Sequence, residues 1–524
     1  MSVEGLSLDI HGEPILRDVS FEVAPGEVFG LVGESGSGKS MTALSAMRLL
    51  PRGAVADGRS GFEGRDLLAA SDRAMCDLRG REMGMIFQEP MTALNPVQTI
   101  GDQVAETLVV HGVASRAAAR AAAEERLERV GLPAGRFPLE RYPHELSGGQ
   151  RQRVCIAMAV ALRPKLLIAD EPTTALDVTI QAQILALLKG LVAEEGMALW
   201  LITHDLAVVA GIATHVAVMR DGRVVESDAT ERLFRSRAHP YTAKLFADSG
   251  HVPRRDAQAR EAPVLEVRGA VREYPLARSA LFGPRPVFRA VDRVDLQVRA
   301  GESVGLVGES GCGKSTLTRA ILGLDALQGG SVRLDGDTVD ARHLHGAVRR
   351  KMQVVFQAPY GSFNPRHRVD RLGAEPFHLD PVAAGERRDR VALALQAVGL
   401  KPGDAGKYIH EFSGGQRQRI AIARAIVIRP KLVILDEAVS ALDVSIRARI
   451  LDLLADLQGR FGLSYLFISH DLSVVRAITD RVLVMRAGRI VEEGRTERVF
   501  AAPAHDYTKT LIAATPRIPQ AWVA

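Results

Sequence analysis

Short apolar runs recur along the chain and are separated by polar segments. Residues 28–32, 166–170 and 199–203 are short segments made mainly of apolar residues, which is typical of strands buried on both faces. Residues 216–219 are also apolar, residues 223–225 read Arg-Val-Val, and the Asp-Gly pair between the two segments favours a tight hairpin turn. The pattern therefore predicts several buried strands and a hairpin in the first half of the chain.

Helical segments lie between these strands. Residues 38–50 follow the first strand, and Pro51 is expected to close the helix they form. Residues 115–131 are rich in Ala, Glu and Arg and predict another helix in the middle of the half. Strands that alternate with helices predict an α/β core, and the helical segment in the middle predicts a separate lobe.

The polar motifs of the first half return in the second half. The paired segments are 33–40 and 308–315, 146–150 and 412–416, 170–171 and 436–437, and 204–205 and 470–471. The two sets lie about 270 residues apart, so the repeat is a duplicated domain and not a short solenoid unit.

The boundary between the two copies is expected in a polar stretch without apolar periodicity. We predict a first domain at 1–250, a linker at 251–263 and a second domain at 264–524. The linker contains prolines, and residues 264–267 (Val-Leu-Glu-Val) look like the opening strand of the second domain.

Composition narrows the class of protein. The 524 residues are 47% apolar, so large cores are possible, and a net charge of +5 without a block of like charge indicates no nucleic-acid surface. Cys76, Cys155 and Cys312 are far apart, which argues against a disulfide framework, a zinc site or an iron–sulfur cluster. We expect no signal peptide, and no stretch approaches the ~18 apolar residues of a membrane span.

Both halves contain Gly-x-x-x-x-Gly-Lys-Ser between a predicted strand and a predicted helix, which is the phosphate-binding loop of P-loop NTPases. Glycines let backbone N–H groups turn towards phosphate oxygens, and the helix N-terminus adds partial positive charge. We expect Lys39 and Lys314 to reach the β- and γ-phosphates of ATP, and Ser40 and Ser315 to hold Mg²⁺. The expected nucleotide contacts are Gly33, Glu34, Ser35, Gly36, Ser37, Gly38, Lys39, Ser40 and Met41, and Gly308, Glu309, Ser310, Gly311, Cys312, Gly313, Lys314, Ser315 and Thr316.

Two carboxylates follow the second buried strand of each half. Asp170 and Asp436 are predicted to bind Mg²⁺ through water, and Glu171 and Glu437 to polarise the attacking water. Because neighbouring side chains of a strand point to opposite faces, the two acids at an exposed strand end could take different roles. An isolated Asp-Glu pair is usually only a polar terminus, but its recurrence in both halves favours the catalytic interpretation.

A histidine and a glutamine complete the predicted catalytic set of each half. His204 and His470 each lie 34 residues after the Asp of the acidic pair, and their recurrence suggests a γ-phosphate contact. Gln88 and Gln357 follow apolar runs and could bind Mg²⁺ or the attacking water while sensing the adjacent lobe.

Ser-Gly-Gly-Gln occurs at 147–150 and 413–416, and with it each half resembles the ABC ATPases throughout. The resemblance implies two tandem P-loop NTPase domains, each with a RecA-like α/β core, an antiparallel β subdomain and a helical subdomain. It also implies that the halves pair head to tail, so that Lys39 shares an ATP with Ser413 and Lys314 with Ser147. The implied signature contacts are Ser147, Gly148, Gly149 and Gln150, and Ser413, Gly414, Gly415 and Gln416.

Further motifs resemble the paired ATPases of oligopeptide and dipeptide importers. Those motifs are 90–96 and 170–177 in the first half, 359–365 and 436–443 in the second, and the tail elements 239–242 and 505–508. The resemblance implies an ATP-hydrolysing subunit for an importer of peptides, or of a related solute such as glutathione or nickel complexes. It further implies two integral-membrane permease subunits as partners, an indirect link to a solute-binding protein, and a peripheral location at the cytoplasmic face of the inner membrane.

The chain departs from this family in two respects. Tyr274 occupies the place of the aromatic residue that stacks on adenine in the second half, but the first half has Ile10 there. Some ATPases of the first type carry a cysteine cluster in the tail, and this chain has none. Because Ile10 has no aromatic ring, the first site is expected to hold adenine more weakly than the second.

Cys312 lies inside the second phosphate loop at the start of a predicted helix, where the pKa of a thiol is expected to fall. The alternative explanation for a cysteine at this position is that its side chain is small enough to fit the loop.

Two other classes of ABC protein are alternatives to the importer ATPase. Soluble tandem ABC proteins that act on ribosomes join their halves by a long, charged helical linker, whereas the linker here is short and contains proline. DNA-repair ABC ATPases carry zinc modules, which three dispersed cysteines do not support.

Overall fold

The computed structural model describes residues 1–174, 176–255, 261–276, 285–342, 345–357, 360–440 and 442–523. The chain forms two compact units. Unit 1 comprises Met1–Leu176, Ile180–Ser249 and Pro516–Ala524, and unit 2 comprises Asp177–Thr179 and Gly250–Thr515. Parts of the predicted linker and of three motifs (256–260, Ala175, Pro359 and Ala441) lie outside the described residues.

The central sheet of unit 1 has six strands in the order β10-β9-β3-β8-β7-β6. Its strands are β3 (Val28–Val32), β6 (Met83–Ile86), β7 (Leu166–Asp170), β8 (Ala198–Thr203), β9 (His215–Arg220) and β10 (Arg223–Ala229). All pairs are parallel except the β9–β10 hairpin. Every residue of β3, β7 and β8 is buried, which explains why their sequences are mainly apolar.

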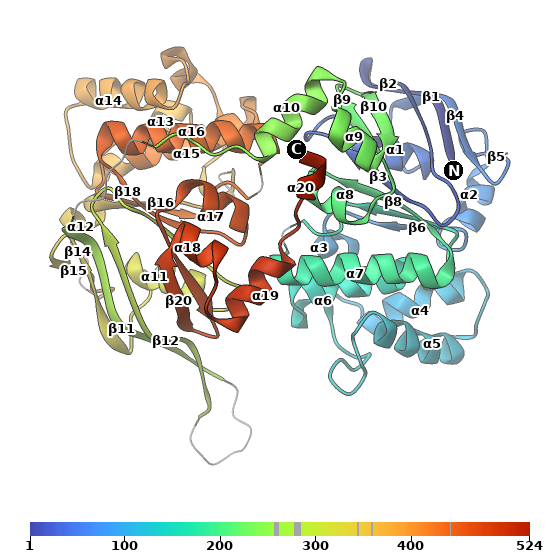
Figure 1. Cartoon of the computed structure of the whole chain (residues 1–524), viewed down its shortest axis with the longest axis horizontal. Coiled ribbons are helices and arrows are strands. Elements are labelled where there is room, and N and C mark those ends of the chain that lie inside the picture. Colours follow the sequence, from blue (N-terminus) through green and yellow to red (C-terminus); the bar gives the residue numbers. More distant parts are fainter. Residues whose placement is uncertain are drawn as a thin grey trace. The chain divides into compact units, whose positions relative to one another are not determined.

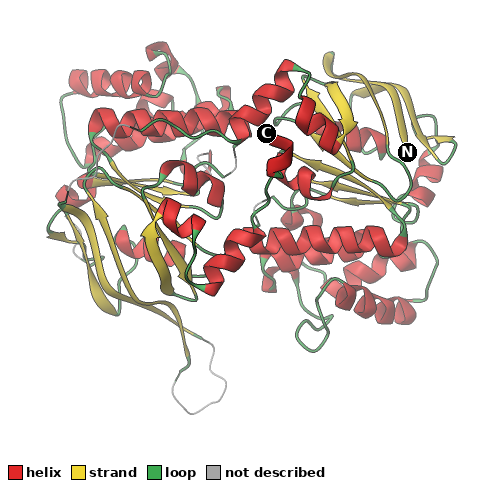
Figure 2. Ribbon diagram, viewed as in Figure 1, coloured by secondary structure: helices red, strands yellow, loops and turns green. Residues whose placement is uncertain are grey.

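A second, antiparallel sheet of unit 1 has the order β2-β1-β4-β5. It is built from β1 (Ser2–Ile10), β2 (Glu13–Glu22), β4 (Ala54–Phe62) and β5 (Arg65–Asp66). Figure 2 shows the strands of both sheets in yellow with helices beside them. The α/β core and the antiparallel sheet agree with the fold class predicted from the sequence.

The helices of unit 1 are α1 (Lys39–Ala46), α2 (Asp72–Leu78), α3 (Pro90–Ala93), α4 (Ile100–Val110), α5 (Arg116–Arg129), η1 (Pro143–Glu145), α6 (Gly148–Ala159), α7 (Val178–Glu195, whose first two residues are grouped with unit 2), α8 (Leu206–Ile212), α9 (Thr230–Ser236), α10 (Pro240–Ser249) and α20 (Gln520–Val523). Helices α4 and α5 lie side by side as part of a helical lobe (Figure 1). Ser115 caps α5 by accepting a hydrogen bond from the N–H of Ala118, which fixes the start predicted for this helix.

The helix that follows the first phosphate loop is shorter than predicted. It ends at Ala46 and not near residue 50. Arg48 adopts a left-handed conformation with φ of 47°, and the N–H of Leu49 donates to the carbonyl of Leu44. This is a Schellman-type ending that needs no proline, so Pro51 does not close the helix.

Unit 2 repeats the plan of unit 1. Its central sheet has the order β16-β17-β18-β13-β19-β20, and its antiparallel sheet the order β12-β11-β14-β15. The strands are β11 (Pro263–Pro275), β12 (Val287–Arg299), β13 (Ser303–Val307), β14 (Gly329–Leu334), β15 (Asp337–Thr338), β16 (Met352–Val355), β17 (Leu432–Asp436), β18 (Ser464–Ile468), β19 (Arg481–Arg486) and β20 (Arg489–Arg495).

The helices of unit 2 are α11 (Lys314–Ile321), α12 (Gly346–Lys351), η2 (Tyr360–Ser362), α13 (Val369–Gly373), η3 (Glu375–His378), α14 (Ala384–Ala397), η4 (Pro402–Gly406), η5 (Ile409–Glu411), α15 (Gly414–Ile426), α16 (Val444–Phe461), α17 (Leu472–Ile478), α18 (Thr496–Ala501) and α19 (Asp506–Ala514). Among the described residues, no helix is long and apolar enough to cross a membrane.

Each unit includes a short segment that is distant in sequence from the rest of it. Val178 belongs to a buried apolar cluster of unit 2 that contains Val307 and Leu472. In unit 1, the ring of Trp522 meets that of Phe234 edge-on at 5.7 Å, and its carbonyl accepts a hydrogen bond from Arg237. The domain bounds predicted from the sequence, 1–250 and 264–524, did not include either grouping.

Candidate functional site

The first phosphate loop runs from the end of β3 into α1. Gly36 and Gly38 have φ angles of 76° and 102°, a region that glycine tolerates better than other residues. A Cβ atom on Gly33 would lie 2.2 Å from the carbonyl oxygen of Met219, so the close approach of these two backbones requires glycine there. The hydroxyl of Ser37 is buried and has no hydrogen-bond partner within the part of the chain that the structure describes.

The lysine of the first loop folds back on the loop itself. The Nζ atom of Lys39 donates to the carbonyls of Gly33 and Glu34, both at 2.8 Å. The neighbouring Ser40 hydroxyl donates to Oδ1 of Asp170 at 3.0 Å and thereby joins the loop to the end of β7. The loop and the first acidic residue therefore form one polar site, and both Ser40 and Asp170 are among the residues predicted to hold Mg²⁺.

The second loop has the same geometry. Gly311 and Gly313 have φ angles of 80° and 112°, and Nζ of Lys314 donates to the carbonyls of Gly308 and Glu309 at 2.6 and 2.9 Å. The sulfur of Cys312 lies 3.8 Å from the same Nζ atom.

The pKa of the Cys312 thiol is raised, which corrects the expectation that it would fall. Burial is the largest cause and favours the uncharged thiol, and the nearby charge of Lys314 opposes it only in part. The side chain is 7% exposed, so the helix N-terminus does not compensate for the loss of water.

The acidic pair of the first half does not lie at an exposed strand end. Asp170 is the last residue of β7 and is only 5% exposed. Burial raises its pKa to about 6, although the hydrogen bond from Ser40 and the charge of Lys39 favour the carboxylate. Glu171 has left the strand, with φ of 47°, so this left-handed turn and not strand alternation separates the two side chains.

Glu171 accepts hydrogen bonds from three side chains. Nε2 of Gln88 lies 3.1 Å and the Thr174 hydroxyl 2.8 Å from Oε2, while Nδ1 of His204 lies 3.2 Å from Oε1. Burial alone would raise the pKa of Glu171, but the hydrogen bond and charge of His204 and the hydrogen bond from Thr174 lower it to about 2. The structure thus brings the predicted glutamine, glutamate and histidine together, and it adds Thr174, which the sequence analysis missed.

The second half reproduces part of this arrangement. Glu437 has φ of 51° and its Oε1 lies 3.0 Å from Nδ1 of His470, which lowers the pKa of Glu437 against the effect of burial. Burial raises the pKa of Asp436 to about 6. Ser440, at the position of Thr174, donates to the backbone carbonyl of Glu437 and not to its carboxylate.

The two glutamines lie just beyond the edge strands of the central sheets. β6 ends at Ile86 and β16 at Val355, so an exposed phenylalanine separates each strand from Gln88 or Gln357. The predicted apolar runs therefore continue one residue past the strands that contain them.

The Ser-Gly-Gly-Gln motifs begin helices α6 and α15. Ser147 accepts a hydrogen bond from the N–H of Gln150, and the side chain of Gln150 accepts one from the N–H of Ser147. Ser413 and Gln416 form the same capping box. Each motif therefore lies at a helix N-terminus, where partial positive charge favours anions.

The second residue of each Gly-Gly pair, Gly149 or Gly415, is buried within its unit. A Cβ atom there would lie 2.5 Å from Cγ2 of Ile180 in unit 1, or 2.7 Å from Cγ2 of Ile446 in unit 2. Glycine is required at these positions because α6 and α15 pack closely against the helices that carry the isoleucines.

The predicted adenine positions differ between the halves. Tyr274 lies near the end of β11, its hydroxyl 3.4 Å from Oδ2 of Asp325, and the guanidinium of Arg272 lies 4.7 Å from its ring centroid. Ile10 ends β1 and packs against the apolar core of unit 1. The aromatic surface expected in the second half is present, and the first half offers an aliphatic side chain.

Three hydrogen bonds to the phosphate loops were not anticipated. The hydroxyls of Tyr241 and Tyr507 accept hydrogen bonds from the N–H groups of Glu34 and Glu309. Within unit 2, a carboxylate oxygen of Asp177 accepts a hydrogen bond from the N–H of Ser310 at 3.0 Å. Both tyrosines belong to the repeated tail elements, and Asp177 is the last residue of the motif at 170–177. The return of these motifs in the second half was the sequence signal that could have identified these residues.

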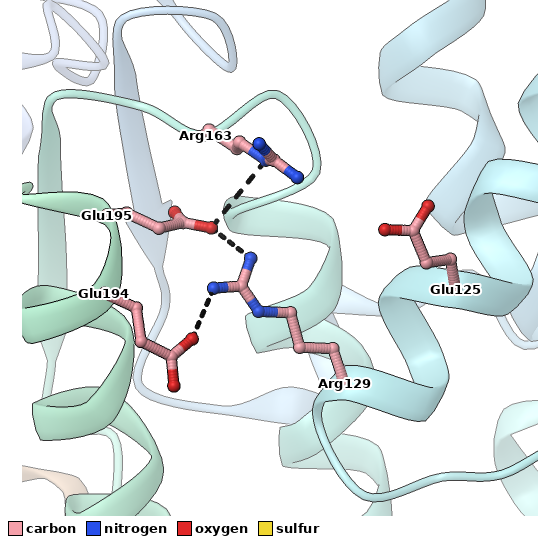
Figure 3. A pocket seen from close by; sticks show the side chains of 5 residues that line it. All are labelled: Glu125, Arg129, Arg163, Glu194 and Glu195. Atoms are coloured by element: carbon pink, nitrogen blue, oxygen red, sulfur yellow. Dashed lines mark hydrogen bonds and ion pairs between the residues drawn. The ribbon is translucent and has the colours of Figure 1, made fainter.

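A cleft of about 550 Å³ lies elsewhere in unit 1, between α5, the loop before β7 and the end of α7 (Figure 3). Arg129 forms ion pairs with Glu194 and Glu195, and Arg163 approaches Glu195 at 3.9 Å. The repeat places Ala397 and Phe461 at the positions of Arg129 and Glu195, so the second half lacks this ion network.

Comparison with known families and proteins agrees with this geometry. The ABC transporter family matches residues 16–174 and 291–440, and the family "Oligopeptide/dipeptide transporter, C-terminal region" matches 491–523. The peptidoglycan transport ATP-binding protein YejF of Agrobacterium fabrum is 48% identical over 98% of this chain and 96% of its own length. The glutathione import ATP-binding protein GsiA is 46% identical in Salmonella typhimurium and 47% identical in Escherichia coli K12, in both cases over 98% of this chain and 89% of its own length.

Family models cover more than half of the chain, and these relatives span nearly all of it. The chain carries two phosphate loops, two Ser-Gly-Gly-Gln helices and two glutamate–histidine pairs in one polypeptide. The protein belongs to the ABC transporter family, as a tandem ATPase of its oligopeptide/dipeptide importer branch.

Proposed function

We propose that the chain hydrolyses Mg²⁺–ATP at two sites and thereby drives import of a peptide or a peptide-like solute. The observation that carries the catalytic part is the hydrogen-bonded set Gln88–Glu171–His204, beside the Ser40–Asp170 contact at the phosphate loop. The second site would use Glu437, His470 and Gln357 with Ser315 and Asp436.

The residues at the loops suit a magnesium ion. Ser40 and Asp170 bring a hydroxyl and a carboxylate oxygen within 3.0 Å of each other, and hard oxygen ligands are those that Mg²⁺ prefers. A cation would also offset the burial that raises the pKa of Asp170. When bound, Mg²⁺ would neutralise charge on the β- and γ-phosphates, and Ser315 and Asp436 would hold it in the second half.

Glu171 would orient the attacking water and accept its proton on a carboxylate oxygen. Its lowered pKa means that it is ionised at neutral pH and makes it a weak base, so orientation is the larger part of its role. Gln88, Thr174 and His204 hold the carboxylate in place, and Lys39 would leave its loop carbonyls to contact the phosphates.

We further propose that each ATP is shared by the loop of one half and the Ser-Gly-Gly-Gln helix of the other. Lys39 would act with Ser413, and Lys314 with Ser147, so one chain would complete both sites without forming a homodimer. The place of both motifs at helix N-termini, where partial positive charge favours anions, supports this role for them.

The proposed partners are two integral-membrane permease subunits, with a solute-binding protein acting through them, at the cytoplasmic face of the inner membrane. Exposed apolar side chains support a docking surface near the glutamines. Phe87, Met91 and Val97 are 42%, 61% and 79% exposed, and Phe356 is 41% exposed in the second half. The lobes differ in sequence beyond each glutamine, which favours two different permease chains.

The relatives named for peptidoglycan transport and glutathione import define the solutes to test. Cells lacking the chain, and cells carrying it with Glu171→Gln and Glu437→Gln together, should lose uptake of a labelled dipeptide, glutathione or a cell-wall peptide. In cells that co-express the permease subunits, the chain should sediment with the membranes. Unchanged uptake of all three solutes would contradict the proposal, and co-sedimentation with ribosomes would favour the ribosome-acting alternative.

A further inference from the structure

A tyrosine in the last helix of each repeat contacts the phosphate loop of the same unit. The hydroxyl of Tyr241, on α10, accepts a hydrogen bond from the N–H of Glu34 at 3.3 Å. The hydroxyl of Tyr507, on α19, accepts one from the N–H of Glu309 at 3.0 Å. The partners are separated by 207 and 198 residues, so only the folded units bring them together.

The loop residue that the tyrosine contacts is held at both its backbone N–H and its backbone carbonyl. The carbonyl of Glu34 accepts a hydrogen bond from Nζ of Lys39, while its N–H donates to Tyr241. To reach a phosphate, Lys39 must give up this carbonyl, whereas the tyrosine contact can persist. The hydroxyl is therefore placed to keep Glu34 fixed while the lysine changes partner.

A chain of hydrogen bonds fixes the start of α10 and with it the tyrosine. The carboxylate of Glu226, on β10, accepts hydrogen bonds from the N–H groups of Ala238 and His239 at 2.9 and 3.1 Å. Nδ1 of His239 then accepts one from the N–H of Tyr241 at 3.2 Å. The carboxylate, the histidine and the tyrosine thus link the central sheet to the loop.

The second unit contains the same chain of contacts. Glu492 accepts hydrogen bonds from the N–H groups of Ala504 and His505 at 2.8 and 3.0 Å, and Nδ1 of His505 accepts one from the N–H of Tyr507 at 3.0 Å. The duplicated domain has therefore kept this set of contacts in both copies.

Both tyrosine rings are also packed in the same way. They are 6% and 5% exposed, and a guanidinium lies over each ring, Arg220 at 5.0 Å from Tyr241 and Arg486 at 4.9 Å from Tyr507. Burial raises the pKa of both phenols to about 12, so the hydroxyls remain uncharged at neutral pH.

We propose that Tyr241 and Tyr507 are positioning residues that hold the two phosphate loops in their nucleotide-binding shape and so make nucleotide affinity depend on the last helix of each repeat. The inference rests on the nucleotide-binding role of the loops and needs neither the solute nor the permeases. A tyrosine that merely fills the core would act through its ring, whereas this role requires the hydroxyl.

The test is Tyr241→Phe in the full chain, which keeps the ring and removes the hydroxyl. ADP and adenosine binding are measured by calorimetry in a Lys314→Ala background. This substitution weakens nucleotide binding at the second loop, so that the first loop dominates the signal. We expect ADP to bind about three- to tenfold more weakly, as for loss of one buried hydrogen bond, and adenosine binding to stay unchanged because adenosine carries no phosphate. Tyr507→Phe in a Lys39→Ala background should give the same result.

Tyr465→Phe is the matched control. Its hydroxyl is buried and donates to the carbonyl of Leu454 at 2.9 Å, so the variant loses a comparable hydrogen bond away from the loops. It should lower the unfolding temperature at least as much as Tyr241→Phe but leave ADP affinity unchanged.

Amide hydrogen exchange of the nucleotide-free protein gives a second readout. The N–H of Glu34 should exchange faster in Tyr241→Phe, and that of Glu309 in Tyr507→Phe, while neither changes in Tyr465→Phe. Unchanged exchange together with unchanged ADP affinity would overturn the inference. Failure of the unsubstituted chain to bind ADP would instead count against the nucleotide site, and exchange would still report on the loop. If Tyr241→Phe does not fold, His239→Ala, which loosens the start of α10, is compared in the same way.

Discussion

Nδ1 of His204 lies 3.2 Å from Oε1 of Glu171, and His470 and Glu437 repeat this contact at 3.0 Å in the second unit. The histidines therefore contact the glutamate that follows the acidic strand. From the sequence, a contact with the γ-phosphate was expected for them. The contact with the γ-phosphate stays a prediction.

Replacing either glutamate should slow hydrolysis without abolishing nucleotide binding. We expect Glu171→Gln and Glu437→Gln each to lower ATP turnover by about 10²-fold or more at the affected site, because an amide cannot accept the proton of water. Turnover and ATP affinity are measured separately by steady-state hydrolysis and equilibrium binding. A variant that hydrolyses ATP at the unmodified rate would identify a half that is not a working site.

His204→Ala should lower turnover through Glu171. The glutamate would lose the hydrogen bond that opposes the effect of burial on its pKa and would keep those from Gln88 and Thr174. His470→Ala should have the larger effect, since Ser440 donates to the backbone of Glu437 and does not replace Thr174. Single-turnover rates of the two variants test this order, and a larger loss in His204→Ala would contradict it.

Cys312 should react slowly with thiol reagents, and its reaction should keep accelerating at high pH. Because burial raises its pKa, the reactive thiolate is scarce at pH 8 and increases only above the range in which an exposed thiol is already ionised. Exposed Cys76 should react first, and Cys155, whose pKa burial raises to about 12, should react last. Mass spectrometry of alkylated peptides between pH 7 and 10 measures the order.

Modification of Cys312 should inhibit ATP hydrolysis, and ATP should protect against it, because the sulfur lies beside Lys314 inside the loop. Cys312→Ser should resist inhibition. Equal inhibition of Cys312→Ser would show that another thiol is responsible.

The two sites should differ in their affinity for adenine. Stacking on an aromatic ring contributes about 1–3 kcal/mol per base in nucleic-acid binders, and Ile10 offers only apolar contact. Tyr274→Ala should therefore weaken ATP binding at the second site roughly five- to 150-fold and remove most of the difference, while Ile10→Tyr should strengthen the first site. The affinity of the first site for ATP is measured in a Lys314→Ala background, and that of the second site in a Lys39→Ala background. Equal affinities of the two sites without the substitutions at Ile10 and Tyr274 would contradict the asymmetry.

Arg129→Ala should destabilise unit 1 by about 1 kcal/mol, since the side chain bridges α5 and the end of α7 and its loss leaves Glu195 poorly paired. Arg120→Ala is the control, because its partners Asp102 and Glu140 are both much more exposed than Glu195. Denaturant unfolding of both variants gives the comparison. A loss no greater than that of Arg120→Ala would show that the bridge contributes little to stability.

Local patterns were enough to predict the elements that carry the chemistry. Apolar runs defined β3, β7 and β8 to within one residue, and the Asp-Gly pair defined the β9–β10 hairpin. The end of α1 was predicted wrongly because a left-handed Arg48 stops the helix before Pro51, and a non-glycine residue in that conformation leaves no clear mark in the sequence.

The sequence by itself determined the family, the fold class and the identity of the polar groups around each loop. Motif spacing constrains these directly, because a strand, a glycine loop and a helix form from neighbouring residues. Tertiary structure alone decided the burial of Asp170 and Cys312, the turn that directs Glu171 towards His204, and the contact of Tyr241 with Glu34. Each of these depends on residues far apart in the chain, so desolvation and hydrogen-bond partners arise only when the separate elements pack together.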